Sequence, residues 1–297
     1  MAAGRGARGF RRPAGRARVA VRRARVLAPP RRARQVGLRP VTGVAAARRA
    51  VLREALEQMT ANFPGAVAGR DPEYLHQLRV GMRRLRAALH IFDATLREAD
   101  VRALRRLLRA LSRVAGPARD WDVHARRLPP ALRPAAERRR RAAYAALRRV
   151  LHAPQLWPPP RGLPSAQVAL PVFAHSVLER ADRRARRRGE QLEWTHAGRR
   201  HDLRIRLRRL RYAAEFLRGA FPGADTEPFI RSLKRLQDAL GELNDLEVAR
   251  RLQAELAGEK PRRGPRTVQR LKALPAAWDA FIAAPRFWRP ARASAGS

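Results

Sequence analysis

Apolar residues recur every three or four positions through most of this chain, a period that is typical of amphipathic α-helices. Between residues 72 and 96, Leu78, Met82, Leu85 and Leu89 fall on one helix face, while Arg and His fall on the other. No convincing alternation of apolar and polar residues occurs, and β-branched residues are sparse. The pattern predicts an all-α fold.

Capping signals place the helix ends. Thr42 is positioned to cap a first helix, and Asp71 followed by Pro72 begins a second, which runs to about Leu96. A third helix is expected at about 101–115, and a short fourth follows it. The remaining helices are expected at 135–151, 172–190, 196–219, 227–240, 244–257 and 266–283.

One helix sequence is written twice. Residues 76–86 (HQLRVGMRRLR) recur as residues 201–211 (HDLRIRLRRLR), at an offset of 125 residues. Two matches at one offset indicate a duplicated structural unit, since Gly116 and Asp120 also return as Gly241 and Asp245. We therefore expect two antiparallel four-helix-bundle-like halves related by a pseudo-twofold axis. Gly116-Pro117 and Gly241 are expected to end helices, and the two Asp residues to cap the next ones.

Composition suggests the domain boundaries. Residues 1–41 are rich in Arg without any acid, and we expect a disordered basic arm there. Residues 153–171 contain six Pro and one Gly, which is typical of a linker. The predicted organisation is an arm (1–41), a first half (42–152), the linker (153–171), a second half (172–285) and a tail (286–297).

The polar face of each repeated helix carries His and Arg at helical spacing. The first row spans roughly 21 Å from His76 to His90 at about 1.5 Å per residue, which suits an extended polyanion. Like charges at i and i+4 cost a few tenths of a kcal/mol per pair. That cost recurs at matching positions of both copies, which favours an anion site over an ordinary solvated face. The rows are His76, Arg79, Arg83, Arg86 and His90, and His201, Arg204, Arg208 and Arg211.

Charge narrows the class of partner. The formal net charge of +41 points to nucleic acid, an anionic surface or a phosphate polymer. The absence of Cys excludes disulfides and thiolate chemistry. No run of 18 apolar residues predicts a membrane span, and no apolar segment near the N-terminus predicts a secretory signal, so we expect a cytoplasmic protein without membrane insertion.

The acids and histidines leave alternatives open. Asp120 and Asp245 are interpreted as helix caps, with a paired acid–base set as the less favoured alternative. His76 and His201 either donate to phosphate or bond to a carboxylate or carbonyl that orients the helix. No carboxylate or second His clearly accompanies either one at ligand spacing, so we predict no metal site and no cofactor. The sequence has no Gly-rich phosphate loop, nucleophile elbow or HExxH motif, and we predict no catalytic residue and no enzyme.

These motifs resemble the CHAD family, named for conserved histidines in an α-helical domain. The resemblance covers about residues 42–285 and rests on the His/Arg segments at 76–86 and 201–211 and on the segments 111–123 and 233–245. It implies two helical bundles around a basic central groove, binding of inorganic polyphosphate, and association with polyphosphate granules. It does not imply the hydrolase activity of triphosphate-tunnel domains that some members carry, because the chain has no room for one.

The two His/Arg rows and the resemblance together predict which residues bind polyphosphate. Arg109 and Lys234 occupy equivalent positions on the helices that follow the stripes, and Arg105 and Arg235 beside them are further candidates. The predicted polyphosphate-binding residues are His76, Arg79, Arg83, Arg86, Arg109, His201, Arg204, Arg208, Arg211 and Lys234.

Two other functions remain as alternatives. Nucleic-acid binding is supported by the charge and the basic arm, but aromatic residues do not interleave with the Arg rows to provide a stacking platform. An enzyme acting on phosphate polymers would use His76 or His201 as phosphoacceptor. Oligomeric state is not predicted from the sequence.

Overall fold

The computed structural model describes residues 27–151, 159–163, 168–190, 192–260 and 264–289. Secondary structure in these residues is helical, apart from a single bridge between Leu96 and Gly162, which confirms the all-α prediction. The helices are α1 (Val44–Ala61), α2 (Phe63–Ala68), α3 (Pro72–Ile91), α4 (Glu98–His124), α5 (Arg133–Leu151), α6 (Leu170–Glu190), α7 (Ala197–Leu217), α8 (Glu227–Ala257), α9 (Pro265–Lys272) and α10 (Leu274–Ala283). None of these helices is both long and apolar enough to span a lipid bilayer.

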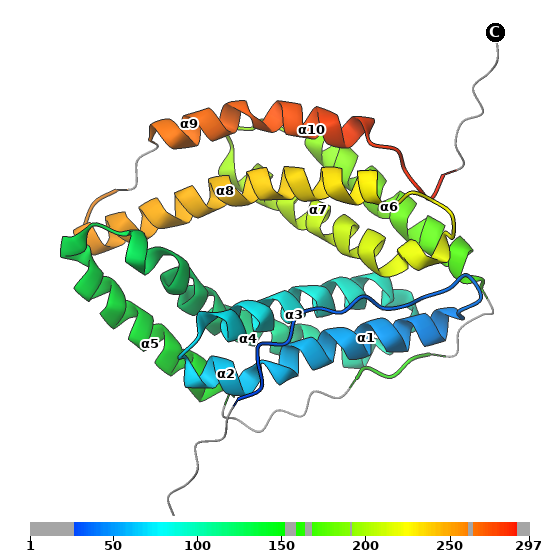
Figure 1. The fold of residues 1–297 in the computed structure, drawn as a ribbon, viewed down its shortest axis with the longest axis horizontal. Helices are drawn as coiled ribbons and strands as arrows, with labels where there is room; N and C mark the ends of the chain where they lie inside the picture. Colours follow the sequence, from blue (N-terminus) through cyan, green and yellow to red (C-terminus); the bar gives the residue numbers. More distant parts are fainter. Residues whose placement is uncertain (1–26, 152–158, 164–167, 191, 261–263, 290–297) are drawn as a thin grey trace, which may run out of the picture.

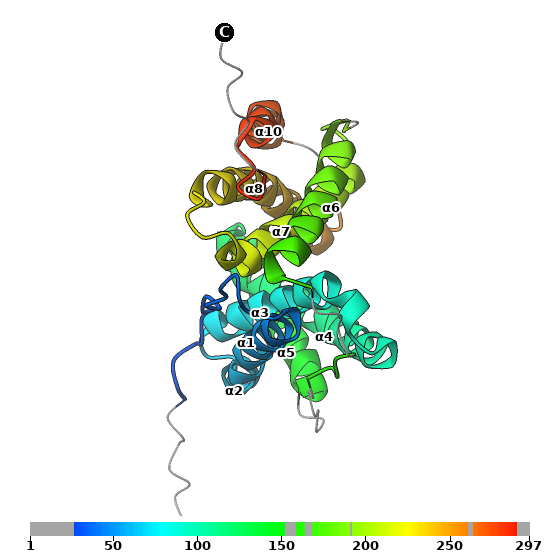
Figure 2. The same ribbon diagram turned by 90° about the vertical axis from the view of Figure 1, so that its right-hand side faces the viewer.

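The helices form two stacked groups, α1–α5 and α6–α10 (Figure 1). In the first group α3 packs against α1 and α4, and in the second α7 packs against α6 and α8. The repeated helices α3 and α7 contact each other where the groups meet. Figure 2 shows the same stacking from the side, with α3 and α7 on the inner surfaces.

A second contact joins the groups near the ends of α4 and α8. Trp121 and Ala125 form a small buried cluster with Leu252 of α8. Arg251 of α8 also pairs with Asp120 of α4 at 3.6 Å. The two inner surfaces are therefore held together at both ends, at α3/α7 and at α4/α8.

The expected breaks at Gly116-Pro117 and Gly241 are wrong, because α4 and α8 continue through them. A glycine that ends a helix usually adopts a positive φ, and among the described glycines only Gly69, Gly223 and Gly258 do so. Pro117 removes one helical hydrogen bond, but its exposed position leaves the freed carbonyl open to water. Asp120 and Asp245 consequently lie inside helices, and the prediction that they cap helix starts is also wrong.

The predicted termini need correction as well. Residues 27–41 are not a disordered arm: Arg31 pairs with Glu54 of α1 at 2.7 Å, and Leu38 is buried. Residues 1–26 lie outside the described residues. At the other end, Trp288 is buried and donates to Glu179 of α6 at 3.1 Å, so the packed domain extends beyond residue 285.

The observed helix ends agree to different degrees with the ends that the capping signals in the sequence predict. Asp71 caps α3 as predicted, because its carboxylate accepts from the Glu73 amide at 2.8 Å. Gly43 rather than Thr42 is the residue before α1, and the Thr42 hydroxyl instead accepts from the Arg39 amide at 3.0 Å. The segment expected as one helix at 266–283 divides into α9 and α10 at Ala273.

Gly81 sets the close approach of α1 and α3, and its substitution gives a first prediction. A Cβ at this position would lie 2.7 Å from the Met59 amide nitrogen, so Gly81→Ala forces the α1 backbone to move. We expect overpacking of about 1–3 kcal/mol to outweigh the gain of about 0.5–1 kcal/mol from replacing a helical glycine. The melting temperature should fall by a few degrees in calorimetry.

Gly241→Ala is the matched control, since nothing lies within 4 Å of its Cβ position. The same substitution should there raise the melting temperature, because a helical glycine is replaced without a clash. Equal shifts in both variants would contradict the tight α1–α3 contact.

Candidate functional site

The repeated helices α3 and α7 each begin with a side-chain cap, about one turn before the first histidine of the row. These histidines are His76 on α3 and His201 on α7. Asp71 caps α3, and the His196 imidazole caps α7 by accepting from the Arg199 amide at 3.2 Å. These caps fix the first turn of each helix, so that His76 and His201 fall at equivalent positions.

The two arginine rows converge on each other. Burial lowers the pKa of Arg204 and of Arg208 on α7, and Arg83 of α3 lies close enough for its charge to lower both further. Arg79 lies on the same helix as Arg83, whose positive charge adds to the effect of burial on the pKa of Arg79. We call Arg79, Arg83, Arg204 and Arg208 the central arginines.

The central arginines are crowded and half-buried. Burial, followed by repulsion from Arg83, lowers the pKa of Arg79 to about 10. The same two causes lower the pKa of Arg208 to about 10. Both values remain far above neutral pH, so the groups keep their charge at a cost to the free protein. A bound anion would offset that cost.

Two carboxylates flank the central arginines at equivalent places of the repeat. Asp120 of α4 lies near Arg79, and Asp245 of α8 lies near Arg204. Burial raises the pKa of Asp120, although Arg79 and Arg251 oppose this effect. Asp120 and Asp245 also feel each other, so α4 and α8 bring the two acids together at this end of the site.

Arg86 and Arg211, the last arginines of the two stripes, are bound to their own halves. Arg86 donates to the Leu108 carbonyl at 2.6 Å and to the Ser112 hydroxyl. Arg211 donates to the side chain of Gln237 at 2.9 Å. Since residues 112 and 237 are related by the repeat offset, both halves tie this arginine to the following helix in the same way.

The remaining candidate residues, which belong to α4 and α8, lie at the edge of the site. Arg109 is exposed on α4, yet it is close enough to help lower the pKa of Arg86, after the larger effect of burial. Lys234 and Arg235 are exposed on α8. Arg105 pairs with Asp93 at 3.1 Å, so its charge is already compensated.

His76 and His201, the first histidines of the two rows, have no hydrogen bond to any other residue that the structure describes. Burial, followed by the charge of Arg119, lowers the pKa of His76. Burial, followed by Arg204 and Arg208, lowers the pKa of His201. Both imidazoles are therefore predominantly neutral at neutral pH. The sequence alternative in which they orient their helices through a carboxylate or carbonyl finds no such bond here.

His124 is a member of this region that the sequence analysis missed. It is buried on α4, and its Nδ1 atom has no hydrogen-bond partner among the described residues. Burial lowers the pKa of His124, while Asp245 and Asp120 oppose the shift. It also lines a cavity of about 700 Å³ beside α8 and α9. Its spacing of four residues from Asp120 was the available signal, but His124 matches no histidine in the second copy.

The site lacks an arrangement for a metal ion. Within the described ranges, no three or more His, Asp or Glu side chains are grouped so that they could hold one. The chemistry that the geometry offers is anion binding by guanidinium groups, with the imidazoles of His76 and His201 at the start of the two rows.

Comparisons with known proteins identify the family and the fold. The CHAD domain profile matches residues 50–254. A crystal structure of the CHAD domain from the plant Ricinus communis superposes with a TM-score of 0.66 at 28% identity, covering 87% of this chain and 98% of that one. PptA from Streptomyces chartreusis superposes with a TM-score of 0.55 at 19% identity, covering 81% and 98%, and so supports the fold alone. A search of curated protein sequences gave no match. The repeated helices lie within the matched region, and the chain belongs to the CHAD domain family.

Proposed function

We propose that this protein binds inorganic polyphosphate along the facing surfaces of α3 and α7. The observation that carries the proposal is the contact of α3 with α7, at which Arg83 lies close to both Arg204 and Arg208. The CHAD family is associated with polyphosphate binding in general, which supports the same ligand.

The chemistry of the site suits a linear phosphate chain. A guanidinium group offers a planar fork of donors that matches phosphate oxygens bidentately. The central arginines are separated by one helical turn on each helix, so successive phosphates can be contacted from both sides. Polyphosphate has no bases, so its binding needs charge but no aromatic stacking platform.

The proposed role is binding without turnover, with association to polyphosphate granules. Histidine donates to the ligand rather than accepting a phosphoryl group, and Asp120 and Asp245 moderate the repulsion among the arginines. Incubation with long-chain polyphosphate should therefore release no orthophosphate above a protein-free blank.

Replacing the four central arginines with Ala should abolish polyphosphate binding. We expect affinity to fall at least about 100-fold, because each charge-assisted contact contributes on the order of 1–2 kcal/mol. The slope of log affinity against log salt should also decrease by about three, since released counterions scale with the contacts. Isothermal titration with long-chain polyphosphate at several salt concentrations measures both quantities.

The matched control removes four exposed arginines elsewhere, by Ala substitution at Arg53, Arg126, Arg138 and Arg141. It makes the same change in net charge and should leave most of the affinity in place. The proposed site is wrong if both quadruple variants bind alike. A DNA duplex that displaces polyphosphate from the unmodified protein would instead favour a general polyanion surface.

Binding should strengthen as the pH falls. The pKa values of His76 and His201 are lowered in the free protein, and a neighbouring phosphate would raise them. The affinity for polyphosphate therefore rises as the pH falls through the pKa values that the two histidines have in the complex. It stops rising below the pKa values that they have in the free protein. We expect a gain of about threefold to tenfold per histidine between pH 8 and pH 5.

The variant with both His76→Gln and His201→Gln keeps the polar side chains but cannot gain charge. Its affinity for long-chain polyphosphate should vary less with pH than that of the unmodified protein, measured by fluorescence anisotropy at constant ionic strength. Identical pH profiles for the two proteins would remove the histidines from the binding site.

A further inference from the structure

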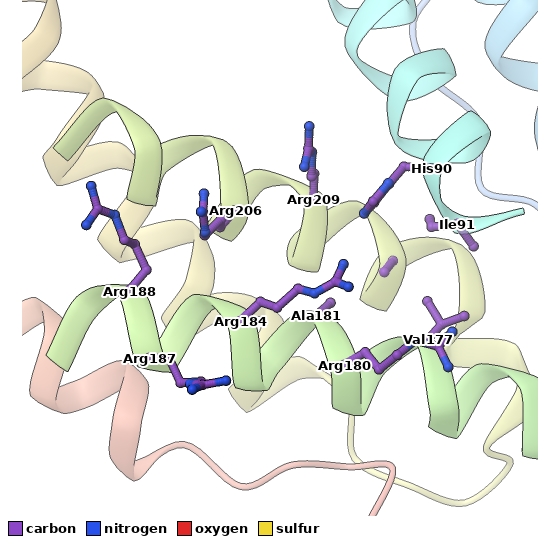
Figure 3. A pocket seen from close by; sticks show the side chains of 11 residues that line it. His90, Ile91, Val177, Arg180, Ala181, Arg184, Arg187, Arg188, Arg206 and Arg209 are labelled. Atoms are coloured by element: carbon purple, nitrogen blue, oxygen red, sulfur yellow. The ribbon is translucent and has the colours of Figure 1, made fainter. Parts of the chain in front are cut away.

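A second basic surface lies between α6, α7 and the end of α3 (Figure 3). It encloses a cavity of about 560 Å³. Arg184 and Arg187 reach it from α6, and Arg206 and Arg209 from α7, while His90 closes it from α3. We call this cavity the α6/α7 groove.

The groove is separate from the central arginines. Successive residues of a helix are rotated by about 100°, so Arg206 and Arg209 project from a different face of α7 than Arg204 and Arg208. None of the four central arginines lines the groove. A ligand here would therefore not need to displace polyphosphate.

A smaller cavity of about 180 Å³ shares equivalent residues with the α6/α7 groove. It is lined by Arg84, Glu215, Phe216 and residues 33–36. The repeat offset of 125 relates Arg84 to Arg209, and Glu215 and Phe216 to His90 and Ile91 of the α6/α7 groove. The two cavities thus occupy corresponding places, and in the smaller one a non-helical segment, residues 33–36, forms a wall.

Acidic side chains hold the segment in the first half. Glu54 of α1 pairs with Arg31 at 2.7 Å and accepts from the Arg34 amide at 2.8 Å. Glu57 pairs with Arg31 at 2.8 Å. Leu38 is buried in the core, which anchors the end of the segment. These contacts hold residues 31–38 in place beside the smaller cavity.

The α6/α7 groove is strongly basic. Its walls carry arginines from both helices, and Gly81 of the first copy is replaced by Arg206. Asp202 pairs with Arg188 at 3.3 Å and Arg206 at 3.6 Å. In the part of the chain that the structure describes, no carboxylate pairs with the other groove arginines, Arg180, Arg184, Arg187 and Arg209.

We propose that the α6/α7 groove binds an acidic, extended peptide segment of a partner protein. The segments outside the described residues (1–26, 152–158, 164–167, 191, 261–263 and 290–297) contain no Asp or Glu, so none of them matches the charge of the groove. A partner protein with an acidic segment does match it.

The groove favours a peptide over a phosphate polymer. Ile91, Val177, Ala181 and Ala213 also line the cavity. Only small areas of Ile91, Val177 and Ala181 remain exposed, but these can contact apolar groups of a peptide. A phosphate chain has no apolar group to place against them. At the corresponding place in the first half, a non-helical segment of this chain, residues 33–36, packs against the cavity.

The test uses a fluorescent peptide derived from residues 27–38, with Arg31, Arg32 and Arg34 each replaced by Glu. Anisotropy measures its binding to the full chain, with and without saturating long-chain polyphosphate. We expect binding that polyphosphate does not compete away. Charge reversal in the variant with Arg180→Glu, Arg184→Glu and Arg209→Glu should weaken it at least about tenfold.

Two controls keep the result interpretable. Arg126→Glu, Arg138→Glu and Arg141→Glu make the same charge change at exposed positions outside the groove and should preserve peptide binding. The unaltered 27–38 peptide, which is basic, should bind the groove variant better than the original protein, because the charges then match. Circular dichroism verifies that each variant remains helical.

The proposal fails if polyphosphate displaces the acidic peptide, or if both charge-reversal variants bind it equally. The first result would assign the groove to phosphate polymers, and the second would indicate nonspecific attraction. Neither result bears on the four central arginines, so failure here is distinguishable from failure of the proposed function.

Discussion

The main constraint on this fold is that the contact of α3 with α7 brings positively charged arginines close together. Arg83 faces Arg204 and Arg208 at the contact of α3 and α7, and their mutual repulsion opposes that contact. Other contacts must therefore hold the halves together. Arg84 stacks over Phe216 at 4.7 Å, and Arg251 of α8 pairs with Asp120 of α4 at 3.6 Å. The charged centre lies between these contacts, where a phosphate chain would relieve the repulsion.

The two helix groups differ away from the repeated arginine rows. Gly81 lets α1 approach α3 closely, whereas its counterpart Arg206 lines an open groove between α6 and α7. In the first group a segment that carries Arg31 is bound by Glu54 of α1. The groove of the second group carries arginines and is left open by the described residues. The first group is therefore the more closed of the two, and the second presents a charged surface.

The sequence revealed features that depend on periodicity but not those that depend on tertiary context. The helical period and the Asp71 cap located α3, and the repeat offset located its counterpart α7. The same local signals failed at Gly116-Pro117, because an exposed proline can remain in a helix that packs well on both sides. They also failed for residues 27–41, where Arg31 and Leu38 are ordered only by contacts with distant parts of the chain. Convergence of the rows was a hypothesis that only the packing of α3 on α7 could support.

The arginines of one stripe do not share one role, and the difference explains how the site can be ordered before a ligand arrives. Arg86 is tied to Ser112, and Arg211 to Gln237, so the last arginine of each row is fixed by the following helix. The central arginines are restrained instead by burial and by the nearby acids Asp120 and Asp245. Side chains that are already restrained lose less conformational entropy on binding. Arginine suits this arrangement better than lysine, because its planar fork can bind one partner and still direct donors toward another.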